Sequence, residues 1–353
     1  MTVRIGFAGV GGMGQCAHLR NYGAIEGCQV VALAELHASK ARAVAQRYNV
    51  PTVYGTIAEM IASEKLDGIV ASQPFNRHGV IVPEVLQAGV PVFTEKPIAA
   101  SVPTGEQIVA SVEASGTWHM VGYHKRSDPA TMYAVQLIDE LKESGELGQM
   151  TYVRIIMPAG DWIASGFTDR LDGDEADQPD YGSLPMDPAD PDMDGDTYQA
   201  YGGFVNYYIH QVNLMRYLLR EDYAVRYADP AQVLLVGQSA SGLPCTIEMS
   251  PYRTTIDWQE TAVVCFERGW IRLDLPAPLA SNRPGKVEIF RDAGDGATPQ
   301  TTIPQLPWIH AMRQQAINFV AAIKGEAEPP CQAAEALADI KLARDYITQL
   351  KES

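Results

Sequence analysis

The stretch VRIGFAGVGGMG, residues 3–14, decides the fold of the first part of this chain. Residues 3–10 form an apolar run that predicts a buried strand, and GVGGMG (9–14) fits the pattern G-x-G-x-x-G between a strand and a helix. Glycines in such a turn let backbone N–H groups approach a pyrophosphate at the N-terminus of the helix, where the dipole favours an anion. The turn therefore predicts a dinucleotide site, although similar turns also occur in purely structural roles.

Glu35 strengthens this prediction. It ends a second apolar run, residues 28–35, and lies about 20 residues beyond the glycine turn, where dinucleotide-binding domains carry an acid. A carboxylate there accepts hydrogen bonds from the adenosine ribose and repels a 2′-phosphate, so the expected cofactor is NAD rather than NADP. The residues expected to hold it are Gly9, Gly11, Gly12, Met13, Gly14 and Glu35.

The first ~125 residues alternate strand-like and helix-like segments, which predicts an α/β fold with a doubly wound, parallel Rossmann sheet. After residue 123 one helix, 130–144, leads into strand-like runs without intervening helices, which predicts an α+β domain with an open, mostly antiparallel sheet. We expect an NAD-binding domain over 1–124 and a substrate-binding and oligomerisation domain over 125–353. Helical periodicity returns over 308–350, and these helices can pack back on the first domain.

An acidic insertion over about 161–199 fits neither pattern. Between residues 169 and 196 it holds eleven acids and one base, so it carries most of the net charge of -16. A loop this long is a lid, a subunit contact or a disordered segment, and all three remain open. DPDMDGD (190–196) imitates the start of a calcium loop, but Tyr201 stands where that loop needs a glutamate. A solvated acidic loop, and no metal, is the prediction.

Composition narrows the remaining possibilities. No window approaches the roughly 18 consecutive apolar residues of a membrane helix, and no basic cluster suggests nucleic-acid binding. Five cysteines without a CxxC pair suggest neither disulfides nor zinc. The chain enters a strand pattern directly, without a leader-like segment, so we expect a cytoplasmic location.

Four motifs in order make the chain resemble the Gfo/Idh/MocA oxidoreductase family, whose members act largely on sugars and cyclitols. FTEKPIAA (93–100) contains the family's EKP motif, and QPFNRH (73–78) resembles its preceding "PN..H" motif. VGYHKRSDPA (121–130) resembles the segment that enters the second domain. GGFVNYYIHQVNLMRYLL (202–219) resembles the helix with the catalytic histidine.

The resemblance implies roles for particular residues. Lys96 and His210 become the catalytic pair that handles the hydroxyl proton while the substrate is oxidised. The expected substrate residues are Tyr123, Lys125, Arg126, Trp162, Asn206 and Tyr207. The further cofactor residues are Ser72, Pro74, Asn76, His78, Glu95, Lys96 and Pro97. The resemblance also allows a cis Lys96–Pro97 bond and implies a homodimer or homotetramer formed through the open sheet.

The sequence departs from the family where many members carry aspartates. Here Asn206 precedes His210 by four residues and Asn213 follows it by three. An amide binds a sugar hydroxyl but does not raise the basicity of a histidine as a carboxylate does. How His210 and Lys96 share the proton is therefore open.

The main prediction is an NAD-dependent dehydrogenase that oxidises a secondary hydroxyl of a sugar, glycoside or cyclitol. The alternative is an NAD-dependent glycoside hydrolase that works by transient C3 oxidation, elimination, hydration and re-reduction. A non-catalytic NAD-binding regulator ranks last, because such proteins tend to lose the lysine or the histidine that this chain keeps.

Overall fold

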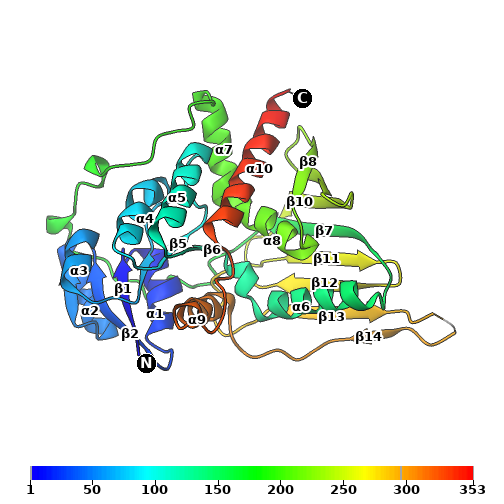
Figure 1. Cartoon of the computed structure of the whole chain (residues 1–353), viewed down its shortest axis with the longest axis horizontal. Helices are drawn as coiled ribbons and strands as arrows, with labels where there is room; N and C mark the ends of the chain where they lie inside the picture. The colour runs from blue at the N-terminus through cyan, green and yellow to red at the C-terminus, as the bar shows by residue number, and fades with distance from the viewer. Residues whose placement is uncertain (1, 295, 353) are drawn as a thin grey trace. The chain divides into compact units, whose positions relative to one another are not determined.

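The structure is a computed structural model that describes residues 2–294 and 296–352 (Figure 1). The chain divides into two compact units. The first unit consists of Met1–Tyr123, Gly166–Tyr198 and Gln315–Ile340, and the second of His124–Ser165, Gln199–Gln314 and Lys341–Ser353. The domain limits expected from the sequence stay a prediction, but most of the acidic insertion groups with the first unit. We call its residues Gly166–Tyr198 the acidic arm.

A six-stranded sheet in the order β3-β2-β1-β4-β5-β6 forms the centre of the first unit, and all its neighbouring pairs are parallel. Its strands are β1 (Val3–Ala8), β2 (Cys28–Ala34), β3 (Thr52–Tyr54), β4 (Gly68–Ala71), β5 (Val92–Glu95) and β6 (His119–Gly122). The connecting helices are η1 (Gly14–Leu19), α1 (Arg20–Tyr22), α2 (Ala38–Tyr48), α3 (Ile57–Ser63), η2 (Phe75–Arg77), α4 (His78–Gln87) and α5 (Val102–Ser115). The predicted Rossmann sheet is confirmed, and its strand order reverses between β1 and β4, where such sheets bind ligands.

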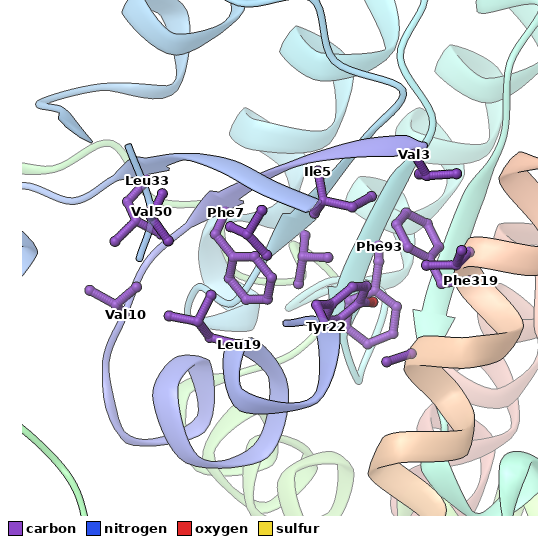
Figure 2. Packing of buried hydrophobic residues seen from close by; sticks show 14 of the residues in the cluster. Val3, Ile5, Phe7, Val10, Leu19, Tyr22, Leu33, Val50, Phe93 and Phe319 are labelled. Carbon is purple, nitrogen blue, oxygen red and sulfur yellow. The ribbon is translucent and has the colours of Figure 1, made fainter. Parts of the chain in front are cut away.

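Buried apolar side chains of β1, β2, β5 and the first helices fill the core of this unit (Figure 2). Phe319 of α9 (Ala311–Ile323) completes it, with ring centroids 5.9 Å from Phe93 and 6.3 Å from Tyr22. The edge-to-face packing of these rings fixes the strands whose carboxyl ends carry the glycine turn and the EKP motif.

Among the elements of the first unit that the sequence did not predict are β3 and α3. The strand has only three residues, none fully buried, so it lacks the apolar run that marks its neighbours. A capping box formed by Thr56 and Glu59 starts α3, a polar signal without an apolar repeat.

The second unit contains an eight-stranded sheet in the order β14-β13-β12-β11-β7-β10-β9-β8. Every neighbouring pair is antiparallel except β7 with β10, which confirms the predicted mostly antiparallel sheet. Its strands are β7 (Met150–Ala159), β8 (Tyr223–Ala228), β9 (Leu234–Ser239), β10 (Pro244–Arg253), β11 (Glu260–Phe266), β12 (Gly269–Leu275), β13 (Lys286–Arg291) and β14 (Gln300–Thr302). Besides α9, the helices after β6 are η3 (His124–Ser127), α6 (Pro129–Ser144), α7 (Gly195–Tyr207), α8 (Ile209–Leu219) and α10 (Ala333–Glu352), and the acidic arm holds η4 (Glu175–Asp177) and η5 (Tyr181–Ser183).

Burial alternates along the central strands of this second sheet. In β11 every second residue is buried, because that side meets helices, with α6 packing on β12 and β13 and α8 on β7 and β10. The opposite side carries half-buried residues such as Ile156 of β7 and Trp270 of β12.

Within the described ranges, no helix has both the length and the apolar character needed to cross a membrane. The same residues contain no group of three or more His, Cys, Asp or Glu side chains that could hold a metal ion.

Candidate functional site

The glycine turn after β1 depends on backbone geometry that only glycine satisfies. Gly9 has a φ of 89°, and a Cβ there would lie 2.5 Å from the Ser72 carbonyl oxygen. A Cβ on Gly14 would lie 2.3 Å from the Gly9 carbonyl oxygen. Gly11 differs, because a Cβ on it would meet nothing within 4 Å. Gly9 and Gly14 therefore close the turn, whereas Gly11 leaves a backbone surface open to a ligand.

A cavity of about 520 Å³ lies beside this turn, within the first unit. Six of the predicted cofactor residues line it: Gly9, Gly11, Glu35, Ser72, Pro74 and Asn76. They come from the carboxyl ends of β1, β2 and β4, the edge at which open α/β sheets bind ligands. The cavity has the size of a small-molecule site, and the open face at Gly11 fits a diphosphate, so these residues fit NAD.

Glu35 joins the glycine turn to the end of β2 through hydrogen bonds. Its Oε2 accepts a hydrogen bond from the Val10 backbone N–H at 2.9 Å, and its Oε1 accepts one from the His37 N–H at 3.1 Å. The Lys40 ammonium lies 3.2 Å from the same Oε1. The carboxylate thus holds the glycine turn while facing the cavity, with spare lone pairs for a ribose.

The other predicted cofactor residues are not among the described residues that line the cavity: Gly12, Met13, Gly14, His78, Glu95, Lys96 and Pro97. His78 is fully buried and lies 3.2 Å from the carbonyl oxygens of Pro97 and Ile98 and 3.3 Å from that of Gln73. It therefore joins the EKP loop to the loop after β4. Burial lowers its pKa, against the effect of these backbone contacts.

The EKP motif begins at Glu95, the last residue of β5, and the Lys96–Pro97 peptide bond is cis. Glu95 Oε1 lies 2.6 Å from His18 Nε2. Burial opposes ionisation of Glu95, but the hydrogen bond from His18 and the charge of Lys96 outweigh it and hold the pKa of the carboxyl below its usual value. Glu95 is therefore a carboxylate beside the lysine.

Among the cavity residues that the sequence did not suggest are Tyr181, Leu184 and Met186. All three belong to the acidic arm. The only signal was a short run of uncharged residues, YGSLPM, inside an otherwise acidic segment.

The comparisons with known proteins agree with an NAD-binding Rossmann fold in the first part of the chain. Residues 3–123 match the family model GFO_IDH_MocA, described as an oxidoreductase family with an NAD-binding Rossmann fold. Over these residues the chain is similar to the Gfo/Idh/MocA oxidoreductases.

Relatives extend over the whole chain. Inositol 2-dehydrogenase from Rhizobium meliloti (strain 1021) is 26% identical over 100% of this chain and 98% of its own length. Inositol 2-dehydrogenase 1 from Saccharopolyspora erythraea is 31% identical, but over only 44% of this chain and 46% of its own. The solved structure of an oxidoreductase from Agrobacterium radiobacter, in complex with NAD⁺, L-tartaric acid and magnesium, shares the fold. Its TM-score is 0.70 at 15% identity, covering 99% of this chain and 97% of that one.

In the second unit, the family's histidine helix is not continuous as predicted. It divides at Tyr208 into α7 and α8. The Tyr208 hydroxyl and Ser250 Oγ share a hydrogen bond of 2.6 Å in which either oxygen can be the donor. His210 lies in the first turn of α8, partly exposed, with its ring centroid 4.5 Å from that of His124. Asn206, in the last turn of α7, is exposed.

Two predicted substrate residues of this unit are buried in contacts of their own. The Lys125 ammonium pairs with the Glu260 carboxylate, which also accepts a hydrogen bond from Gln211 at 2.7 Å. Arg126 Nε donates to Asn213 Oδ1 at 2.7 Å, and its guanidinium lies 4.5 Å from the centroid of Tyr217. Both charges thus hold η3 against neighbouring elements, and a substrate role for them stays a prediction.

The remaining predicted substrate residues lie in different surroundings. Tyr123 is buried at the end of the first unit. In the second unit, Trp162 is half-buried, and its carbonyl oxygen accepts the Leu279 N–H at 3.3 Å. Tyr207 packs edge-to-face on Tyr208, with ring centroids 4.9 Å apart, and burial raises the pKa of its hydroxyl.

Alanine substitutions at Gly11 and Gly14 should distinguish a glycine that contacts the ligand from one that the fold of the turn requires. We expect Gly11→Ala to fold with an unchanged melting temperature but to bind NADH at least about tenfold more weakly, because the methyl group enters the open face. Gly14→Ala should instead lose roughly 1–3 kcal/mol of stability through its clash with Gly9. Thermal melting and fluorescence titration with NADH measure both effects. Equal losses of stability in the two variants would contradict the assignment of Gly11 as a ligand-facing position.

Proposed function

We propose that this chain is an NAD-dependent dehydrogenase that oxidises a secondary hydroxyl of a sugar or cyclitol. The observation that carries the proposal is the cavity lined by Gly11, Glu35 and Asn76 at the carboxyl edge of a parallel sheet whose strand β5 ends at Glu95, directly before Lys96. The names of the relatives, inositol 2-dehydrogenase among them, support polyols as the substrate class.

Bound NAD supplies the hydride acceptor for the carbinol carbon. The protein then has to take the hydroxyl proton and stabilise the oxygen as negative charge grows on it. Lys96 suits stabilisation of the oxygen, because it directly follows the last residue of β5 and the neighbouring Glu95 is ionised. His210 suits uptake of the hydroxyl proton, because imidazole exchanges protons near neutral pH.

The surroundings of Asn213 affect how this work is shared. In place of the family's aspartate, its amide oxygen accepts a hydrogen bond from Arg126, so it orients that side chain. No carboxylate occupies either family position beside His210 in the sequence. We therefore assign the larger share of transition-state stabilisation to Lys96, with His210 as the proton acceptor.

Substitution of the catalytic pair tests these roles. Lys96→Ala should lower kcat by about 10³-fold or more and His210→Gln by about 10²-fold, with NADH binding retained in both variants. Steady-state NADH formation with a panel of inositols, aldoses and other polyols measures the loss. Full activity in Lys96→Ala would remove the lysine from the chemistry, and absence of NADH formation across the panel would contradict the dehydrogenase.

The same assay separates the redox-neutral alternative. A glycosidase that recycles its NAD would release an aglycone from a glycoside without net NADH. The comparisons give this glycosidase alternative no support. A regulator that binds NAD without turnover would produce neither NADH nor a released aglycone.

We also propose a homo-oligomer formed through the open side of the second sheet. That side presents apolar residues, including Ile156, Val263, Trp270 and Phe290, among ion pairs such as Arg154 with Glu248. Flat sheet faces of this mixed character suit a self-complementary contact. Sedimentation of the purified protein should give a dimer or tetramer, and Trp270→Glu should shift it towards the monomer. A wild-type monomer at micromolar concentration would contradict the proposal.

A cytoplasmic location is the remaining proposal. All five cysteines are free thiols in the structure, as expected in a reducing compartment. Localisation of a tagged chain in fractionated cells tests it, and recovery from an oxidising compartment would overturn it.

A further inference from the structure

The acidic arm lies along the rim of the cofactor cavity in the first unit (green in Figure 1). It is fixed near the glycine turn by Gln15. The side-chain Nε2 of Gln15 donates to the carbonyl oxygens of Val10 at 2.7 Å and Leu171 at 2.9 Å, and its Oε1 accepts the Leu171 N–H at 2.9 Å. The arm is therefore joined to the glycine turn, whose open face at Gly11 fits a diphosphate.

A second anchor lies next to Glu35. Asp177 accepts hydrogen bonds from the Ser39 N–H at 2.7 Å and the Ser39 hydroxyl at 2.8 Å, and it lies 2.7 Å from His37 Nε2. In return the Asp174 N–H donates to Ser39 Oγ at 2.8 Å. The hydrogen bonds from Ser39, together with the charge and hydrogen bond of His37, lower the pKa of Asp177.

A third anchor lies on the opposite side of the cavity, at the start of α4. Asp187 Oδ2 accepts the Gly79 N–H at 3.0 Å, and the Asp187 N–H donates to the Asn76 carbonyl oxygen at 2.6 Å. Arg77 Nε donates to the Pro185 carbonyl oxygen at 3.3 Å. Both loops that border the cavity are thus held by the arm.

Between these anchors the arm presents uncharged side chains to the cavity. Tyr181 and Met186 are 42% and 52% exposed, and Leu36 and Val80 across from them are 39% and 38% exposed. All four line the same cavity. Exposed apolar residues gathered around one cavity mark a surface that a ligand covers, and adenosine offers a flat, largely apolar face of this kind.

The charges of the arm are distributed accordingly. Its anchoring carboxylates are turned onto N–H and hydroxyl donors, so they do not oppose an anionic cofactor across the cavity. Asp177 also accepts the hydrogen bond of the Ser39 hydroxyl and pairs with His37. Both donors lie beside Glu35, and a 2′-phosphate there would need them.

We propose that the acidic arm is the outer wall of the NAD site, which slows release of the cofactor and, through Asp177, excludes NADP. This inference rests on the cofactor site proposed above. Tyr181, Leu184 and Met186 contact the adenosine half of the dinucleotide, whereas Asp177 and Asp187 are positioning residues that keep the wall in place. Exchange of cofactor then requires the arm to detach.

The test measures release of NADH from the full-length protein by stopped-flow fluorescence after mixing with excess NAD, without any sugar substrate. Asp177→Ala, Asp187→Ala and Tyr181→Ser should each release NADH at least about tenfold faster than the unmodified protein. Asp192→Ala is the matched control, because it removes one exposed acid of the same arm and should leave the rate unchanged. Asp177→Ala should also raise the affinity for NADPH relative to NADH about tenfold, and Asp187→Ala should not.

Thermal melting without cofactor shows whether the Asp187→Ala variant is folded. Tyr181→Ser keeps the test decisive in that case, because the exposed tyrosine contributes little to folding. Unchanged release rates in Tyr181→Ser and Asp177→Ala, with NADH still bound, would overturn the role of the arm alone. Failure of the unmodified protein to bind NADH would overturn the cofactor site, and the arm proposal with it.

Discussion

The hydrogen bond from the Val10 backbone to the Glu35 carboxylate is the interaction on which the site depends. It joins the loop after β1 to the end of β2, so it holds the glycine turn together with the acid that we propose binds the ribose. The same carboxylate accepts from His37, whose ring lies against Asp177. One series of contacts therefore runs from the glycine turn to the acidic arm.

This arrangement explains how a chain with a net charge of -16 can bind an anionic cofactor. Most of the excess acids lie in the arm, and those nearest the cavity are bonded to donors of α2 and α4. Uncharged residues of the arm face the cavity between them. The acidic side chains nearest the cavity thus attach the arm to the first unit, and we propose that the open backbone at Gly11 supplies the donors for a diphosphate.

Much of this could be predicted from the sequence. The spacing of the glycine turn and Glu35 follows from strand and helix geometry, whereas the EKP motif was found by resemblance to a family. The structure places six of the predicted cofactor residues on one cavity. The position of the arm could not be predicted, because its anchors pair Asp177 with Ser39 and Asp187 with Gly79, residues more than a hundred positions apart. Short-range patterns carry no information on such contacts. The partners of Lys125 and Arg126 were hidden for the same reason, since a basic side chain looks alike in sequence whether it meets a substrate or a buried acid.

The asparagines at 206 and 213 leave His210 without a carboxylate at either of these two sequence positions. Asn213 serves Arg126, and the ionised Glu95 lies beside Lys96. The central claim is nevertheless about the first unit, where cofactor and arm share one cavity. A crystal structure of the chain with NAD tests it most directly. The account predicts ribose hydroxyls on Glu35 and adenine in contact with Tyr181 or Met186; NAD bound with the arm displaced from Ser39 and Gly79 would contradict it.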